Sequence, residues 1–302
     1  MSSVVAPRPV EASHPVAPEQ PTFTIVIPAR NESASVGGLV WNIRALQPDA
    51  EVLVVNDGSD DETAALAADA GARVISHRYS KGNGAAIKTG ARAATGRTLV
   101  FMDADGQHRP EDIARLLERI DQGCDMVIGA RDAASQASIF RHTGNWIYNR
   151  VASWMTGHRI PDLTSGFRAV NARKFREFLF MLPNGFSYPT TITMAFFRSG
   201  YTVEYIPISA PRRMGKSHLN LLRDGVKFLL IIFRVSTLYS PLKVFMPIAL
   251  AMFLLATGWY GWTFAHEGRF TNMSALLYSG SVLVFLLGLI SEQITALLYK
   301  GE

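Results

Sequence analysis

Cysteine is almost absent from this sequence, and so are long runs of basic residues. Cys124 is the only cysteine among 302 residues, so no disulfide forms within the chain and no metal cluster can be built from thiolates. This composition fits a reducing compartment. The formal net charge is +5, but the sequence has no zinc finger, RNP motif or nucleic-acid-binding Lys/Arg run. We therefore expect no nucleic-acid partner.

Several motifs that would assign a function directly are also missing. No Walker A sequence is present and no G-x-G-x-x-G follows the first predicted strand, which disfavours P-loop and dinucleotide-binding functions. No Ser–His–Asp or Cys–His pairing indicates covalent catalysis. The N-terminus lacks the apolar core of a signal peptide. Residues 1–21 contain five prolines and little that could pack, and we expect a disordered tail.

From Thr22 onward, β-rich runs alternate with helical patterns. The predicted strands are 23–29, 51–57, 73–79, 98–105 and 125–131, and the predicted helices are 35–46, 61–70, 84–94 and 110–121. This alternation implies right-handed crossovers and a mostly parallel sheet, which is an α/β fold. Farther along, residues 141–155 and 190–200 predict helices and 201–208 predicts a strand. In the first of these helices, the side chains expected to pack are Trp146, Ile147, Trp154 and Met155.

The stretch LVFMDADGQHRPED, residues 99–112, is the centre of the predicted site. Four apolar residues form a buried strand that runs directly into Asp103 and Asp105. Alternation along an extended backbone points these two carboxylates the same way. Such a pair suits a hard divalent cation that also contacts substrate phosphates. A D-x-D sequence by itself is more often a solvated turn. The surrounding sequence must therefore show whether this pair binds a metal ion.

The ends of the other predicted strands supply that context. Polar groups gather where parallel strands end, which is where open α/β sheets bind ligands. The first strand ends through Pro28 and leads into Arg30 and Glu32, the second ends at Asp57, the third leads into Lys81 and the fifth ends at Arg131. Lys81, with Gly82 and Gly84, favours a phosphate contact through backbone N–H groups. By contrast, Ser59 to Glu62 have a purely structural use at the start of the next helix.

Two later segments add basic groups. In PDLTSGFRAV, residues 161–170, a tight turn at Ser165 and Gly166 directs Arg168 toward the cleft, with Asp162 beside it. The loop 210–218 carries Arg212, Arg213 and Lys216, which are suited to phosphate contacts unless the loop is simply a solvated charged one.

The last third of the chain is apolar and predicts membrane association. Residues 219–240 form a basic amphipathic helix expected to lie on an anionic bilayer surface. Two apolar runs follow, at about 244–265 and 273–290, each long enough to span a hydrocarbon core of roughly 30 Å. Four basic residues precede the hairpin and only Arg269 lies in its loop, so the positive-inside rule places the large domain and both termini in the cytosol.

Six motifs together resemble one known family. FTIVIPARNES, VLVVNDGSDDET, KGNGAAIKTG, FMDADGQHRPEDI, DLTSGFRA and RRMGKS are similar to the family-2 glycosyltransferases of GT-A fold. The most similar branch is that of the polyprenyl-phosphate glycosyltransferases of the dolichol-phosphate-mannose synthase type. The resemblance covers residues 22–218, and the hairpin at 241–302 matches the members that carry one. Any one motif is weak, but six in this order are specific.

The resemblance implies a Rossmann-like catalytic domain in an integral membrane protein, located in the plasma or inner membrane if the source is bacterial. It also implies a nucleotide-diphosphate sugar donor, UDP- or GDP-linked, a polyprenyl-phosphate acceptor and Mg²⁺ or Mn²⁺. Asp103, Asp105 and Gln107 would hold the metal ion. Pro28, Arg30, Glu32, Asp57 and Lys81 would contact the nucleotide. Asp103, Asp105, Arg131 and Arg168 would be the catalytic residues, and Arg131, Arg168, Arg212, Arg213 and Lys216 would bind the acceptor phosphate.

Two departures and several alternatives stay open. Asn56 stands where the family often has an aspartate, and the lysine of the basic loop is shifted by comparison with R-x-x-G-x-S-K members. A non-catalytic scaffold or transporter with a degenerate sugar-nucleotide domain is the main alternative. A processive polysaccharide synthase is disfavoured because Q-x-x-R-W is absent. Soluble nucleotidyltransferases would leave the hairpin unexplained. The sugar, the base, the prenyl length and a homo-oligomeric state are left open.

Overall fold

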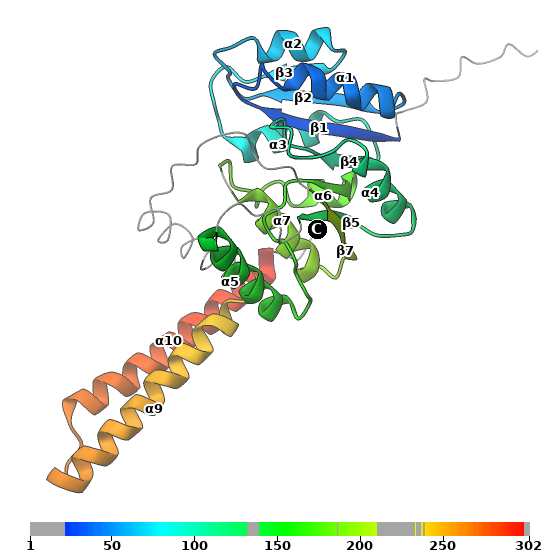
Figure 1. The fold of residues 1–302 in the computed structure, drawn as a ribbon. Helices are drawn as coiled ribbons and strands as arrows, with labels where there is room; N and C mark the ends of the chain where they lie inside the picture. The colour runs from blue at the N-terminus through cyan, green and yellow to red at the C-terminus, as the bar shows by residue number, and fades with distance from the viewer. Residues whose placement is uncertain are drawn as a thin grey trace, which may run out of the picture.

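The computed structural model describes residues 22–131, 139–185, 187–209, 233, 237 and 239–298. Its ribbon shows a sheet domain from which two long helices extend as an arm (Figure 1). The strands are β1 Phe23–Ala29, β2 Glu51–Asn56, β3 Arg73–Ser76, β4 Thr98–Phe101, β5 Met126–Arg131, β6 Arg168–Asn171 and β7 Val203–Ile208. The domain's helices are α1 Val36–Leu46, α2 Thr63–Asp69, α3 Asn83–Ala93, α4 Asp112–Asp121, α5 Ile139–Thr156, α6 Ala172–Glu177 and α7 Tyr188–Arg198.

The strands form one sheet in the order β3-β2-β1-β4-β6-β5-β7. The pairs β1–β2, β2–β3, β1–β4 and β5–β7 are parallel, whereas β6 runs antiparallel to β4 and β5. The chain moves outward from β1 to β3 and then returns to place β4 on the other side of β1. Ligands bind at such a reversal in open α/β sheets. The predicted mostly parallel α/β fold is confirmed.

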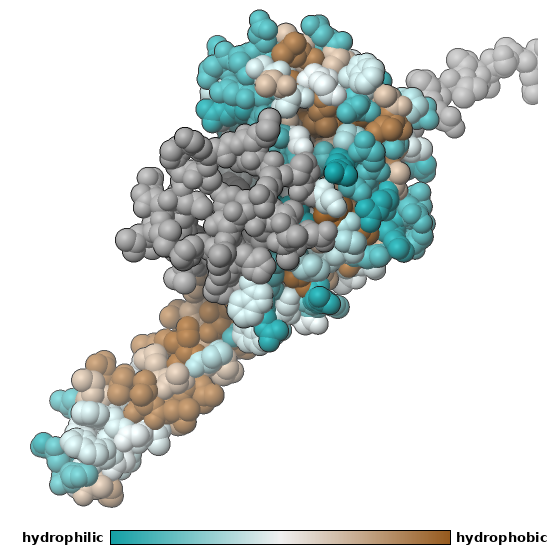
Figure 2. Space-filling model, viewed as in Figure 1, coloured by the Kyte–Doolittle hydropathy of each residue, from teal (hydrophilic) through white to brown (hydrophobic). Residues whose placement is uncertain are grey.

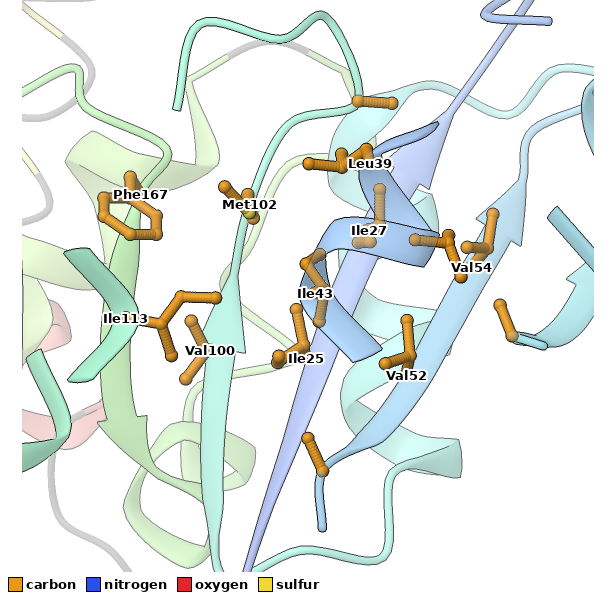
Figure 3. Packing of buried hydrophobic residues seen from close by; sticks show 14 of the residues in the cluster. Ile25, Ile27, Leu39, Ile43, Val52, Val54, Val100, Met102, Ile113 and Phe167 are labelled. Atoms are coloured by element: carbon orange, nitrogen blue, oxygen red, sulfur yellow. The ribbon is translucent and has the colours of Figure 1, made fainter. Parts of the chain in front are cut away.

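Helices cover both faces of the sheet because the strand side chains alternate. Ile25 and Ile27 of β1 lie on the face that packs against α1, α2 and α4 (Figure 3). Val26, between them in the sequence, packs on the opposite face with α3, α6 and α7. Both faces are apolar, as expected for strands that are buried on two sides.

Three details differ from the sequence prediction. The strand β4 ends at Phe101, so Asp103 and Asp105 belong to a turn and the alternation argument does not reach them. The strand β6 was not predicted, because its four residues RAVN are too short to give a periodic pattern. Trp146 and Trp154 were expected to pack, but they are 59% and 58% exposed. Met155 is buried, as expected, and the side chain of Ile147 lies outside the described part.

The arm is a hairpin of α9 Pro241–Glu267 and α10 Asn272–Leu298. Both helices are long and apolar enough to cross a membrane, and most of their surface is exposed. Figure 2 shows a hydrophobic band along the hairpin with a more hydrophilic tip. Small residues bring the two helices together. Gly288 lies against Phe245, and the Ser281 hydroxyl donates a hydrogen bond to the Ala249 carbonyl oxygen at 2.8 Å.

Polar contacts join the hairpin to the sheet domain. Arg198, the last residue of α7, pairs with Glu292 of α10 at 3.3 Å and donates to the Tyr239 carbonyl oxygen. The other carboxylate oxygen of Glu292 accepts from the Leu242 N–H at 3.1 Å and the Ser240 hydroxyl at 3.2 Å, both at the start of α9. Glu292 therefore caps one membrane helix from the other and links both to the domain.

We expect Glu292→Ala to loosen this junction. The variant removes the acceptor of the Ser240 hydroxyl and of the Leu242 N–H and the carboxylate that pairs with Arg198, at a cost of about 2 kcal/mol. Thermal unfolding of the detergent-solubilised full chain measures the effect. Glu267→Ala is the matched control, because this second hairpin glutamate pairs with the exposed Arg269 near the tip. An equal shift in both variants would contradict the assignment.

Candidate functional site

The candidate site is built from the loops that leave one edge of the sheet. The strands β1, β2, β4 and β5 end at this edge, and the antiparallel β6 begins there. The loop before β6, residues 161–167, therefore faces the loops after β4 and β5. Contacts join them. A Cβ added at Gly166 would lie 2.8 Å from Asp103 Oδ2, so a side chain there would force the carboxylate to shift.

The turn after β4 carries Asp103, Asp105 and Gln107, as predicted. Asp105 Oδ1 accepts the Gln107 N–H at 3.2 Å, and Gly106 takes a left-handed φ of 72° that closes the turn. His108 Nδ1 faces the Asp103 N–H at 3.3 Å, and its ring stacks on Phe167 with 5.0 Å between centroids. His108 therefore braces the turn against the loop before β6.

Burial governs the charges in this turn. It raises the pKa of Asp103, and the neighbouring Asp105 charge adds to this effect, while His108, Arg131 and Arg168 oppose it. Burial lowers the pKa of His108. Burial makes the ionised form of such a carboxylate costly in the protein alone. A cation placed beside it would offset that cost.

The oxygen donors of the turn fit a divalent metal ion. Within the described residues, no group of three His, Cys, Asp or Glu side chains is arranged to hold one. The turn instead offers two carboxylates and the amide oxygen of Gln107. Mg²⁺ and Mn²⁺ accept such a set when substrate phosphates and water complete the coordination. The residues present therefore fit a cation held together with a phosphorylated substrate.

Arg131, at the end of β5, forms a bidentate ion pair with Asp162. Its Nε lies 2.7 Å and its Nη2 3.0 Å from the two carboxylate oxygens, and Nη2 also donates to the Thr164 hydroxyl at 2.8 Å. Burial raises the pKa of Asp162, but the hydrogen bonds and charge of Arg131 outweigh it, so the net pKa is lowered. This pair fixes the guanidinium beside the Asp103 turn.

Arg168 does not reach the cleft predicted for it. The side chain is fully buried, and its guanidinium donates to the Pro189 carbonyl oxygen and the Thr193 hydroxyl, both at 3.1 Å, and to the Ser165 carbonyl oxygen. Burial lowers its pKa. On β6 the alternation places Arg168 on the face packed against α7, away from the open edge. In the structure, the hydrogen bonds of Arg168 connect α7 to the sheet.

We expect Arg168→Met to destabilise the fold without changing acceptor binding. The variant keeps the apolar volume but leaves buried carbonyl oxygens without this donor, which costs about 2 kcal/mol. The unfolding midpoint and the acceptor KM of the full chain separate the two effects. A raised KM at unchanged stability would return Arg168 to a substrate-binding role.

The Asp57 carboxylate, directly after β2, is surrounded by donors from one loop. Its oxygens lie 2.7 Å from His77 Nδ1 and 2.8 Å from the Ser80 hydroxyl, the Lys81 N–H and the Gly82 N–H. Burial alone would raise the pKa of Asp57, but these bonds outweigh it and the pKa is lowered. Asp57 therefore holds the β3–α3 loop, residues 77–82, against the end of β2.

The predicted phosphate cradle at the start of α3 is wrong. The Lys81 and Gly82 N–H groups are used by Asp57, and the Gly84 and Ala85 N–H groups donate to the carbonyl oxygens of Gly185 and Asn184. Gly84 is required because a Cβ there would lie 2.0 Å from the Pro183 carbonyl oxygen. The Lys81 side chain is exposed and its ammonium lies 5.8 Å from the Tyr79 ring.

The remaining predicted residues are placed as follows. Pro28 lies within β1 and Arg30 follows it, exposed. The Glu32 N–H donates to the Thr63 hydroxyl at 2.9 Å, and its carboxylate accepts from the Ser35 hydroxyl at 3.2 Å. Arg212, Arg213 and Lys216 lie outside the described residues, as does most of the predicted amphipathic helix 219–240.

Three contributors were missed as site residues. His108 stands in the predicted stretch, but a single histidine beside a D-x-D gave no pattern to interpret. His77 closes the Asp57 network and lies in a segment predicted to be strand. Asp162 was noticed beside Arg168, whereas its partner is Arg131, 31 residues earlier. Only the unpredicted β6, which sets this loop against β5, brings that pair together.

Comparisons with known proteins agree with this arrangement. The model of glycosyl transferase family 2 matches residues 24–179, and that of the GtrB C-terminal hairpin matches residues 240–297. The polyprenol monophosphomannose synthase of Mycolicibacterium smegmatis is 31% identical over 68% of this chain and 83% of its own length. The glycosyltransferase AglJ of Haloferax volcanii is 28% identical over 93% of this chain and 96% of its own length.

Among solved structures, the fold matches glucosyl-3-phosphoglycerate synthase from Mycobacterium tuberculosis in complex with Mn²⁺, uridine-diphosphate and glucosyl-3-phosphoglycerate. The TM-score is 0.56 at 20% identity, over 71% of this chain and 80% of that one. This similarity concerns the fold of the sheet domain.

Proposed function

The chain belongs to glycosyl transferase family 2, and from this premise we propose that it transfers one sugar from a nucleotide-diphosphate sugar to a polyprenyl phosphate at the membrane surface. It is a membrane glycosyltransferase with a GT-A sheet domain and a C-terminal hairpin. The donor, the acceptor and the roles of individual residues are the proposed parts. Relatives named for polyprenol, undecaprenyl-phosphate and dolichyl-phosphate transfer support the lipid acceptor.

The observation that carries the proposal is the position of the loop 161–167. Its Asp162 holds Arg131 and its Gly166 backs Asp103, so the loop forms one wall of the site. Its Leu163 is buried in a cluster against which Val244 of α9 packs. The loop that walls the charged site is thus linked through this one buried cluster to the start of the membrane hairpin, which supports chemistry close to a lipid-borne acceptor.

The proposed reaction is attack of a polyprenyl-phosphate oxygen on the anomeric carbon of the sugar, which expels a nucleoside diphosphate with inversion. A phosphate monoester has its second pKa near 6, so the attacking oxygen is largely ionised at neutral pH. No strong general base is then required. The protein's task is to neutralise two anionic groups and to align them.

Different residues of the site would carry out different parts of this task. Asp105 and Gln107, with Asp103, would hold Mg²⁺ or Mn²⁺, which when bound neutralises charge on the donor diphosphate. Arg131, fixed by Asp162, would orient a phosphate at the same edge. Pro28, Arg30, Glu32, Asp57 and Lys81 stay the proposed nucleotide-contacting residues, with Asp57 acting at least through the loop that it holds.

We further propose that the sheet domain, residues 22–218, lies on the cytosolic side with the segment 219–240 along the bilayer surface. Basic residues before α9 outnumber those in the hairpin loop, which supports this orientation.

The test is to supply membranes containing the full chain with radiolabelled UDP- and GDP-sugars and a polyprenyl phosphate, with Mg²⁺ or Mn²⁺ or with a chelator. We expect label in the organic extract as a single-sugar lipid with one donor, and none with the chelator. Label in a polymer would indicate a processive synthase. Nucleotide binding without transfer would indicate a scaffold.

A further inference from the structure

The helix α5 presents an exposed aromatic and basic stripe. Trp146, Arg150 and Trp154 are spaced by four residues and share one face, opposite the buried Tyr148, Ala152 and Met155. Both tryptophans are more than half exposed. Two exposed tryptophans that flank an arginine on one helix face form a contiguous aromatic and basic patch, unlike the isolated Trp41 of α1, and such a patch indicates an interaction surface.

A pocket continues the stripe beyond the end of α5. It is lined by Arg150 and Trp154 together with His158 and Arg159 from the turn that follows, and its volume of about 740 Å³ is large enough for a phospholipid headgroup. His158 is held in place by stacking on Phe197, with 5.0 Å between ring centroids. The sequence 139–161 contains three arginines and two histidines but no acidic residue. The surface therefore favours an anionic partner.

The end of α5 is fixed to the start of the membrane hairpin. The Lys243 ammonium donates to the Met155 carbonyl oxygen at 2.8 Å, and Val244 packs against the cluster that contains Met155. Figure 1 shows α5 beside the domain end of α9 and α10. The stripe thus lies at the level where α9 begins.

The spacing of tryptophans along the hairpin locates the bilayer relative to this level. Trp259 and Trp262 lie near the far end of α9, where tryptophan is typical of a membrane–water interface. Trp262 lies nineteen positions after Lys243, which is about 28 Å along a helix and close to the hydrocarbon thickness of roughly 30 Å. If Trp262 marks one interface, Lys243 and the end of α5 fall at the other.

We propose that the α5 surface, consisting of Trp146, Arg150, Trp154, His158 and Arg159, docks on the bilayer and takes an anionic phospholipid headgroup in its pocket. The tryptophans enter the interfacial layer while the arginines pair with headgroup phosphates. Together with the hairpin, this contact determines the orientation of the sheet domain relative to the membrane. The inference rests on the proposed membrane placement but not on the identity of the sugar or of the acceptor.

The experiment uses the full chain with ¹⁹F-labelled tryptophan in nanodiscs of phosphatidylcholine and phosphatidylglycerol. A small fraction of the lipid carries a gadolinium chelate on its headgroup. The chain has five tryptophans, so the resonances are few and can be assigned by single Trp→Phe variants. We expect the Trp146 and Trp154 signals to lose most of their intensity. Trp41 on α1 is 67% exposed and is the internal control that stays sharp.

Charge variants test the headgroup contact. Arg150→Gln with Arg159→Gln should restore part of the Trp146 and Trp154 intensity, and raised salt should do the same by screening. Arg92→Gln with Arg97→Gln, exposed residues on α3 and before β4, makes the same charge change and should leave the signals as in the parent. Omitting phosphatidylglycerol should also restore intensity, and an unchanged signal would overturn the headgroup assignment.

Two outcomes separate failure of this inference from failure of the membrane placement. Broadened Trp259 and Trp262 with sharp Trp146 and Trp154 would overturn α5 docking while the hairpin still spans. Sharp signals from all four of these tryptophans would overturn the proposed membrane placement itself. A Trp146 or Trp154 signal that responds to protein dilution but not to the gadolinium lipid would assign the surface to a second copy of this chain and overturn the proposal.

Discussion

Asparagine in place of Asp105 is expected to lower sugar transfer by about 1,000-fold, which corresponds to ~4 kcal/mol of transition-state stabilisation. Asp105 sits in the turn at the end of β4, where its carboxylate accepts the Gln107 N–H. The amide keeps the shape and one acceptor oxygen but removes the charge that would hold a cation against the donor diphosphate. We therefore expect the Asp105→Asn variant to fold normally and to be defective in sugar transfer.

The measurement pairs transfer to extracted lipid with calorimetric binding of a nucleoside diphosphate, each with and without Mn²⁺. We expect the parent chain to bind more tightly with Mn²⁺ and Asp105→Asn to lose that increment. Asp121→Asn, an exposed residue at the far end of α4, makes the same substitution and should behave as the parent. Turnover within a few-fold of the parent in Asp105→Asn would refute the metal-binding role.

The elements that determine the class of fold were predictable because each carries a strong local pattern. The first strand and the first helix each give several periods of apolar spacing, so their positions agree within a residue or two with β1 and α1. The hairpin was equally predictable, because two apolar runs long enough to span a bilayer and joined by a short polar loop indicate a pair of membrane helices. The motif FMDADGQHRPEDI then located the Asp103 turn, and the end of the fifth predicted strand located Arg131.

The pairings within the site were not predictable, because they depend on contacts between distant segments. Arg131 and Asp162 meet only because the short β6 runs antiparallel beside β5. Arg168 was assigned to the cleft from its place after a glycine turn. Strand alternation, invisible in a four-residue element, sends it to the buried face instead. Local sequence thus identified the charged residues but not their partners.

The Asp57 network shows the same limit and gives the second large prediction. Alanine at Asp57 removes the acceptor for His77, for the Ser80 hydroxyl and for two backbone N–H groups of the β3–α3 loop. Leaving several donors without a charged acceptor should cost about 3 kcal/mol of stability. The loop beside the nucleotide-binding edge should also loosen, so donor KM should rise. Asp69→Ala, an exposed aspartate at the end of α2, is the control.

The pH dependence separates this structural role from a direct nucleoside contact. The pKa of Asp57 is lowered in the folded chain, so its contribution to stability is complete above its unfolded pKa of about 4 and is lost as pH falls through the lower folded value. Thermal unfolding of Asp57→Asn should therefore be less acid-sensitive below about pH 4 than that of the parent chain. If Asp57→Asn instead keeps the parent's stability at every pH and raises only the donor KM, the carboxylate acts on the nucleoside itself, and the loop is held by other contacts.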